Sequence, residues 1–227
     1  MKYCVVNADD FGMSQGINRG ILEAHFNGIV TSTSLVVNMP FSEEAAFLSR
    51  DAPDLSVGLH INLTGESPDP IIALNNINDF WGEIDRQFQR FHELMNRPPT
   101  HLDVHQNVHR EPRLLPFVLD LSRLHRLPLR EYSLVRYFPN FYGYWEGETH
   151  LEQISVESLA QMLETEFKEA YTELSCHPGY MDSNFQSFYA IERETELRTL
   201  CDPRIRQKIS ELNIELINFR DIGVSSQ

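Results

Sequence analysis

The sequence has few cysteines, few basic residues and no long apolar run. Its three cysteines are an odd number in 227 residues, which excludes a disulfide framework and favours a cytoplasmic location. Lysine and arginine number 19 against 33 aspartates and glutamates, and this net charge of −14 argues against nucleic-acid binding and membrane docking. No stretch approaches the ~18 apolar residues of a membrane span, and the first ten residues lack the apolar core of a signal peptide.

The composition is that of an ordinary globular domain. Hydrophobic residues make up 41% and charged residues 23%, which excludes a disordered or fibrous chain. At roughly 150 residues per domain, this length favours one domain that spans residues 1–227. The chain contains no G-x-G-x-x-G and no G-x-x-x-x-G-K-[ST] motif, so nucleotide-binding forms of an α/β fold have little support.

Short apolar runs and amphipathic segments alternate about seven times along the chain, which predicts parallel strands joined by crossover helices. We therefore expect an α/β fold, a distorted single-domain (β/α) barrel similar to a TIM barrel, with about seven parallel strands. The expected strands are residues 3–6, 29–37, 55–61, 101–105, 127–132, 174–177 and 214–217. The expected helices are residues 14–26, 42–48, 84–95, 114–125, 156–171, 191–200 and 205–212, and residues 64–82 are expected to form a loop.

Polar residues stand at the ends of several expected strands. Asp9 and Asp10 come directly after the first strand, and His60 lies near the end of the third. Arg130 lies near the end of the fifth strand, and His177 ends the sixth. Because the carboxyl ends of parallel barrel strands form one rim that carries the chemistry, we expect these side chains to converge.

The adjacent aspartates have two interpretations. Neighbouring strand residues point to opposite sides, so one carboxylate could bind a metal while the other faces a water that the metal holds. Alternatively, the pair belongs to an ordinary turn, because aspartate and asparagine favour turns. The apolar run before Asn7 and the following Phe11-Gly12 favour a position on the rim.

Residues 101–109 also have two interpretations. On a strand, His101, Asp103 and His105 share one face, whereas on a helix the histidines at 101, 105 and 109 form a stripe. The prolines just before this segment and the β-branched Val104 favour the strand. A carboxylate beside a histidine is the usual pairing that fixes the tautomer of a metal ligand. Solvated surface histidines are the alternative.

Two further features stay open or are set aside. Cys176 precedes His177, but neighbouring strand residues point to opposite faces, so thiol catalysis is not expected. The aromatic residues 136–145 could stack on sugar rings, or they could pack as a satellite cluster under a long loop.

Several short motifs together resemble one known family. In order and spacing they resemble the YdjC-like carbohydrate deacetylases, relatives of the polysaccharide deacetylases, over residues 2–221. The motifs are residues 7–12 (NADDFG), 28–33 (GIVTST), 58–60 (GLH), 99–105 (PTHLDVH) and 176–178 (CHP). The resemblance implies a distorted barrel, often dimeric, and a hydrolase that removes acetyl groups from N-acetylated carbohydrates.

The resemblance also implies roles for five residues of this chain. A divalent metal would be held by Asp10, His60 and His105. Asp9 would be the general base and His177 the general acid. The family is often described with Mg²⁺, whereas one carboxylate and two imidazoles suit Zn²⁺, Co²⁺ or Ni²⁺.

Four other residues are expected around these five, either behind the metal ligands as hydrogen-bond partners or in contact with the substrate: Asp103, His101, Asn107 and Arg130. Asn107 departs from the family, which commonly has a histidine there, and the segment after His60 is shorter than in typical members. The expected partner is an acetylated carbohydrate, with no nucleic acid or membrane, and the expected assembly is a homodimer. The alternatives are another metal-dependent hydrolase, such as a phosphoesterase, and a non-catalytic carbohydrate-binding protein.

Overall fold

The fold is built around β1 (Lys2–Phe11), which has strands on both sides. The computed structural model describes residues 1–64, 77–182, 185 and 187–222. The strand order of the main sheet is β4-β3-β2-β1-β8-β5, and β9 pairs with the amino-terminal part of β1. The other strands are β2 (Ser32–Leu35), β3 (Ser56–Ile61), β4 (Leu102–Val104), β5 (Arg136–Phe138), β8 (Tyr171–Cys176) and β9 (Ile214–Ile217).

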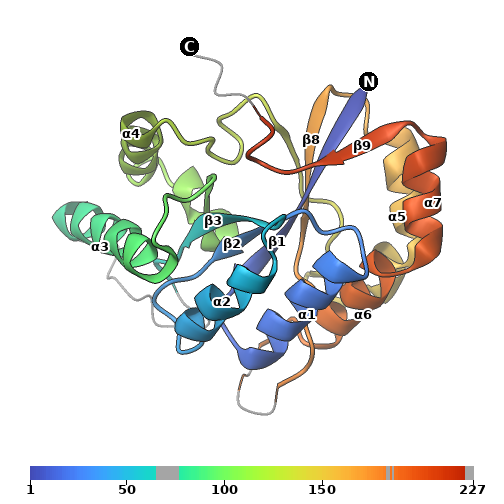
Figure 1. Cartoon of the computed structure of the whole chain (residues 1–227), viewed down its shortest axis with the longest axis horizontal. Helices are drawn as coiled ribbons and strands as arrows, with labels where there is room; N and C mark the ends of the chain where they lie inside the picture. Colours follow the sequence, from blue (N-terminus) through green and yellow to red (C-terminus); the bar gives the residue numbers. More distant parts are fainter. Residues whose placement is uncertain (65–76, 183–184, 186, 223–227) are drawn as a thin grey trace.

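All pairings in this seven-stranded sheet are parallel, which confirms the predicted architecture. Figure 1 shows the strands curled at the centre, with the helices around them. The sheet is a half-barrel: in the described residues, its edge strands β4 and β5 share no ladder. The helices are α1 (Gln15–Phe26), α2 (Ser42–Leu48), α3 (Ile77–Met95), α4 (Leu115–His125), α5 (Val156–Thr165), α6 (Ile191–Leu200) and α7 (Pro203–Glu211).

Smaller elements connect these pieces. They are the 3₁₀ helices η1 (Ser49–Asp51), η2 (His105–Arg110) and η3 (Leu151–Ile154), and a hairpin of β6 (Tyr144–Trp145) and β7 (Glu148–Thr149). No helix in the described part of the chain has the length and apolarity needed to cross a bilayer.

Local sequence explains where several helices begin. The Ser14 hydroxyl accepts the Ile17 N–H at 3.2 Å and caps α1, as the sequence predicted. Asp202 caps α7 in the same way, and Pro203 occupies the first turn, where its missing N–H costs nothing.

The two faces of the sheet differ in polarity. Asn7, Ser32 and Ser56 are aligned across β1, β2 and β3, and all three are buried. The alternate residues face the helices, so that Val6 packs in the main hydrophobic core with Ile17 of α1. The helices therefore bury the outer face of the sheet, and polar side chains collect on its inner face.

One predicted strand, residues 127–132, is wrong. Only Leu129 makes an isolated bridge there, to Leu102, and the next strand of the sheet is β5. Pro128 has no N–H to donate to a ladder, and Glu131 has a left-handed φ of 68°, which no extended strand contains. The pairing partner of β8 comes instead from the aromatic segment.

Other boundaries also differ from the prediction. β1 continues through both aspartates, because Phe11 still pairs with β2. The third helix begins at Ile77 instead of residue 84, and the fifth ends at Thr165 instead of residue 171, where β8 begins. Most of the loop predicted at residues 64–82, residues 65–76, lies outside the described residues, as does the shortened segment after His60.

Candidate active site

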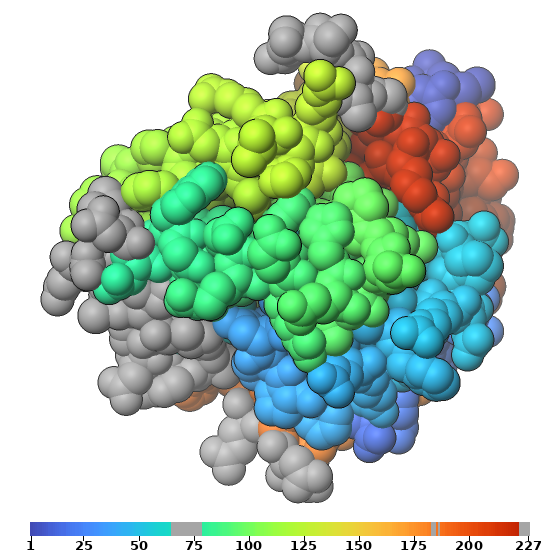
Figure 2. Space-filling view, turned by 60° about the vertical axis from the view of Figure 1, so that its left-hand side comes forward, coloured from blue at the N-terminus to red at the C-terminus, as the bar shows by residue number. Residues whose placement is uncertain are grey.

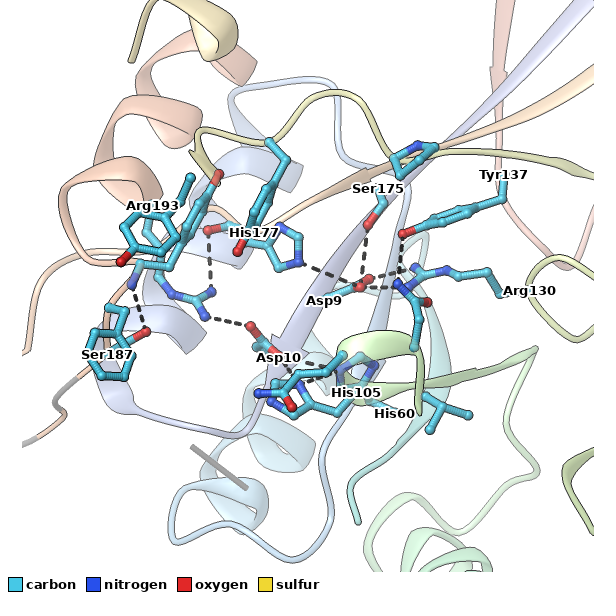
Figure 3. A pocket seen from close by; sticks show the side chains of 18 residues that line it. Asp9, Asp10, His60, His105, Arg130, Tyr137, Ser175, His177, Ser187 and Arg193 are labelled. Carbon is cyan, nitrogen blue, oxygen red and sulfur yellow. Dashed lines mark hydrogen bonds and ion pairs between the residues drawn. The ribbon is translucent and has the colours of Figure 1, made fainter. Parts of the chain in front are cut away.

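A cavity of about 550 Å³ lies at the carboxyl ends of the strands (Figure 3). Side chains from β1, β3, α6 and the segments that follow β4 and β8 line it. The nine residues predicted for the site divide into seven that line the cavity and two that do not. The seven are Asp9, Asp10, His60, His105, Asn107, Arg130 and His177.

Asp9 and Asp10 both reach the cavity, although neighbouring strand residues were expected to point to opposite sides. The register between β1 and β2 shifts between Ala8 and Phe11, so the strand is irregular there. Asp10 also has a φ of 75°, in the left-handed region that aspartate tolerates better than most residues. This irregularity turns two adjacent, buried carboxylates toward one space.

Asp10, His60 and His105 bring three possible ligand atoms together. Asp10 Oδ1 lies 3.4 Å from His60 Nε2 and 3.2 Å from His105 Nδ1. The two ring nitrogens are 3.2 Å apart, and all three residues are buried. These atoms form a nearly equilateral triangle that opens on the cavity.

The triangle has the dimensions of one face of a metal coordination shell. Ligand atoms about 2.1 Å from a tetrahedral ion lie about 3.4 Å apart, and those of an octahedral ion about 3.0 Å apart. Within the described residues, Asp10 Oδ1 accepts no hydrogen bond, although it is buried. A buried carboxylate oxygen without a donor is costly unless a cation faces it. The three residues therefore fit a divalent ion.

The charge around the triangle also fits a cation. Four buried carboxylates lie beside two buried guanidinium groups, so the carboxylates outnumber the guanidinium groups two to one. The carboxylates are those of Asp9, Asp10, Asp103 and Glu173, and the guanidinium groups are those of Arg130 and Arg193.

Asp103 does not line the cavity but orients His60. Its Oδ1 lies 2.8 Å from His60 Nδ1, so this ring nitrogen donates to the carboxylate and Nε2 faces the triangle. Burial lowers the pKa of His60, but Asp103 and Asp10 outweigh that effect and raise it to about 10. An ion bound at Nε2 has to displace a proton held there.

Arg130 fixes Asp9 through two hydrogen bonds of 2.7 Å, one to each carboxylate oxygen. The same guanidinium donates to Glu173 at 2.6 and 2.8 Å, and it lies 3.0 Å from Asp103. Burial alone would raise the pKa of Asp9, but Arg130 lowers it below the ordinary value. Burial raises the pKa of Glu173 to about 7, against the lowering effect of Arg130.

His177 lies on the other side of Asp9, just after β8, as Figure 3 shows. Its Nε2 is 3.8 Å from Asp9 Oδ2, and its Nδ1 is 3.8 Å from Glu196 Oε1. Glu196 is fully buried, and its other oxygen accepts the His177 backbone N–H. Burial lowers the pKa of His177, but Glu196 and the two aspartates outweigh it, so the net shift is upward.

Sequence reasoning missed Arg193, Glu196 and Glu173. Arg193 of α6 donates to Asp10 Oδ2 at 2.6 Å, which leaves Oδ1 to the triangle. A signal for the α6 residues was present: Arg193 and Glu196 share a helical face with the core residues Leu197 and Leu200. Charged residues at core spacing indicate a buried ionic contact.

The remaining predicted residues have different surroundings. His101 lies outside the cavity, with its ring stacked on Phe219 at 3.9 Å and against Gly58, where any Cβ would collide with it. Asn107 lines the cavity and donates to the Tyr137 hydroxyl at 3.5 Å. Cys176 is fully buried, its pKa is raised by burial, and it faces away from the cavity that His177 lines.

The aromatic segment contributes a wall of the cavity. Tyr137, Tyr142 and Tyr144 line it. Tyr142 stacks on Tyr189 with ring centroids 4.5 Å apart and planes 2° from parallel. Rings from residues 136–145 therefore face the same space as the carboxylates and histidines.

The family model of YdjC-like proteins matches residues 3–211. This chain belongs to the YdjC-like family. A carbohydrate deacetylase of Geobacillus stearothermophilus is 37% identical over 97% of this chain and 98% of its own length. A chitooligosaccharide deacetylase of Serratia marcescens is 34% identical over 97% of this chain and 99% of its own.

A solved structure has a similar fold over nearly the whole chain. A protein of Enterococcus faecalis V583, provisionally named a cellobiose-phosphate cleavage protein, superposes with a TM-score of 0.84 and 28% identity. The superposition covers 97% of this chain and 98% of the Enterococcus faecalis chain. The resemblance inferred from the YdjC motifs and the predicted barrel are both confirmed.

Proposed function

We propose that this YdjC-like protein is a metal-dependent carbohydrate deacetylase, which hydrolyses the acetamide of N-acetylated sugars to acetate and a free amine. One observation carries the proposal: a carboxylate and a histidine lie 3.8 Å apart beside a triangle of metal-type ligands in one cavity. Amide hydrolysis needs a proton acceptor, a proton donor and a polarised carbonyl at one place. The names of the two bacterial relatives agree with this chemistry.

Asp10, His60 and His105 would hold the ion in this proposal. When bound, a divalent ion supplies a Lewis acid for the acetyl carbonyl and acidifies a nearby water. Two imidazole ligands favour Zn²⁺, Co²⁺ or Ni²⁺ over Mg²⁺, which prefers oxygen ligands. Asp103 orients His60 through a hydrogen bond to Nδ1, and Arg193 orients Asp10 through a hydrogen bond to Oδ2. Such outer hydrogen bonds commonly fix metal ligands.

Asp9 acts as the general base. It accepts a proton from the attacking water while the water oxygen bonds to the acetyl carbon. Arg130 lowers the pKa of Asp9, so this carboxylate is ionised at neutral pH but is a weak base. A weak base suffices when the water is already acidified.

His177 acts as the general acid. As the bond between the acetyl carbon and nitrogen breaks, it gives its proton to the nitrogen, which would otherwise leave as a strongly basic anion. Glu196 supports the charged imidazolium, because its Oε1 lies 3.8 Å from Nδ1 and it also holds the backbone of His177. The proton gained by Asp9 and the proton lost by His177 balance.

The surroundings of the two arginines argue against a phosphoesterase, the second function considered. A phosphate substrate needs unneutralised cations, and here Arg130 and Arg193 are both engaged by buried carboxylates. A non-catalytic binding protein would have no need for the pairing of Asp9 with His177.

We further propose a homodimer in a reducing cytoplasm. The three free cysteines support the location, and two of them are buried. The dimer rests on the family resemblance alone. Light scattering after size-exclusion chromatography tests the assembly, and cell fractionation tests the location.

A paired assay tests the function. Metal-loaded protein is incubated with N-acetylated chitooligosaccharides, and the released acetate and free amine are measured beside phosphate release from a phenyl phosphate. We expect acetate and amine in equal amounts, and no phosphate above that of the Asp9→Asn variant. Phosphate release without acetate would replace the proposal with a phosphoesterase, and neither product would leave a binding protein.

A further inference from the structure

A second cavity, of about 340 Å³, lies at the other end of the half-barrel from the catalytic residues. Four separated segments line it: the start of β3, the residues before β4, the loop after α4 and the residues after β9. Segments coloured cyan, green and red accordingly meet on the face shown in Figure 2. Nothing in the deacetylation chemistry uses this cavity.

The charge of this cavity is opposite to that of the molecule. Three arginines, Arg97, Arg126 and Arg220, are among its lining residues, and none of the described lining residues is acidic. The chain as a whole has 33 acidic and 19 basic residues. The nearby Asp221 does not line the cavity, and its carboxylate accepts the Asn218 N–H at 2.9 Å.

The three guanidinium groups lack the carboxylate partners that many other arginines have. Arg204, for example, pairs with Glu157 and Asp202 at 2.9 Å. Within the described residues, Arg97 and Arg126 form no ion pair, and the guanidinium of Arg220 donates only to the Pro53 carbonyl, at 2.9 Å. The described part of the chain therefore does not neutralise their positive charge.

Two of these charges also oppose each other. Burial and the nearby Arg220 both lower the pKa of Arg97. Both side chains are exposed, so water weakens this repulsion, and a bound anion would remove what remains of it. Guanidinium forks match the oxygens of a phosphate group, to which each can donate two hydrogen bonds.

The rest of the lining is apolar. Leu127, Pro128, Phe219 and Ile222 contribute to it, and the ring of Phe219 stacks on that of His101. An apolar cleft of this size with a few charged groups is typical of a small-molecule site. Inorganic phosphate alone would leave this apolar surface unused.

We propose that this cavity binds an organic phosphate monoester, with its phosphate between Arg97, Arg126 and Arg220 and its organic part on the apolar wall. The site is separate from the catalytic cavity and does not depend on the proposed deacetylase activity. A free metabolite and a phosphorylated headgroup share this chemistry, and the net charge of −14 favours the free metabolite over a ligand in an anionic membrane.

Calorimetric titration with phenyl phosphate tests the proposal, with inorganic phosphate as the second probe. We expect saturable binding of phenyl phosphate, tighter than that of inorganic phosphate. Arg97→Gln and Arg220→Gln should each weaken it about 10- to 100-fold, the usual effect of losing a charged hydrogen bond. Both variants should keep wild-type deacetylase kcat/KM.

The matched control is Arg123→Gln, an exposed arginine of α4 that pairs with Asp120 outside the cavity. It should bind phenyl phosphate like the wild type. The proposal is overturned if the wild type shows no saturable binding, or if Arg97→Gln binds as tightly as Arg123→Gln, which would place the ligand elsewhere. Equal affinity for the two probes would overturn the role of the apolar wall.

Discussion

The candidate active site has two halves, a proposed metal-binding half of Asp10, His60 and His105 and a proposed proton-transfer half of Asp9 and His177. The two differ in how fully the protein alone satisfies their polar atoms. In the first half, Asp10 Oδ1 accepts no hydrogen bond from the part of the chain that the structure describes, and it faces two ring nitrogens at 3.2 and 3.4 Å. In the second, both oxygens of Asp9 already accept hydrogen bonds from Arg130. The first half therefore has a structure that a cation completes, whereas the second has its protonation states set by the protein.

β1 joins the two halves, because its irregular end supplies one aspartate to each. Separate substitutions in the two halves should therefore have separate consequences. Loss of the metal half should remove both metal and activity, and loss of the proton-transfer half should remove activity alone.

The largest effect is expected from His105→Ala in the metal half. The variant loses one of the three expected ligands, so its metal content by elemental analysis should fall well below that of the wild type, and its deacetylase activity with it. The exposed His125 of α4 provides a matched control, and His125→Ala should keep both. Stoichiometric metal in His105→Ala would remove this residue from the ligand set.

Asp9→Asn should keep the metal and lose the rate. The amide has nearly the same shape but cannot accept the proton of the water, and loss of a general base typically costs ~10²–10⁴-fold in kcat. Metal content and thermal unfolding are measured on the same preparation, because the amide also weakens the contact with Arg130. Loss of metal together with activity would show that the two aspartates have exchanged roles.

His177→Ala should separate amides from esters. An amide nitrogen needs a proton to leave, whereas the phenolate of phenyl acetate does not. We therefore expect kcat/KM to fall strongly for an N-acetyl sugar and far less for phenyl acetate. Equal losses on both substrates would mean that His177 positions the substrate or stabilises the oxyanion.

The metal half could be predicted from sequence because its signals are local. A buried strand followed by two aspartates, and a strand that ends in a histidine, place Asp10 and His60 on one rim wherever the strands run parallel. The same rule located Asp9 and His177. It could not place His101, which lies just before β4 and packs on Phe219 from the last segment of the chain.

Glu173, which pairs with Arg130 beside Asp9, was not predictable in the same way. Glu173 lies within β8, and its position in the alternation of that strand does not distinguish it from other strand residues. Its partner Arg130 is 43 residues away in sequence. Arg130 itself was located on a strand that does not form, yet its position at the rim was right. Contacts between distant segments depend on how the sheet curls, which periodicity does not reveal.

The smallest effect is expected from Glu196→Gln, and it concerns pH. Glu196 raises the pKa of His177, and the protonated form of His177 is lost as pH rises through that pKa. A glutamine keeps most of the shape but removes the charge, so the alkaline limb of kcat for an N-acetyl sugar should move to lower pH.

The raised pKa of His177 should also make folding stability depend on pH. A histidine whose pKa is raised in the folded state stabilises the fold below its unfolded pKa, and this contribution disappears as pH rises through the folded value. Glu196→Gln should therefore lose more stability in acid than in alkali, by comparison of thermal midpoints with the wild type.

Glu192→Gln is the matched control for both measurements. Glu192 is as buried as Glu196, lies one helical turn before it on α6, and accepts a hydrogen bond from the Thr149 hydroxyl at 2.5 Å. The alkaline limb of kcat in Glu192→Gln should stay at the wild-type pH, even if weakening the hydrogen bond to Thr149 lowers stability. An equal shift in both variants would mean that α6 acts on the site through its packing, and that the charge of Glu196 does not set the pKa of His177.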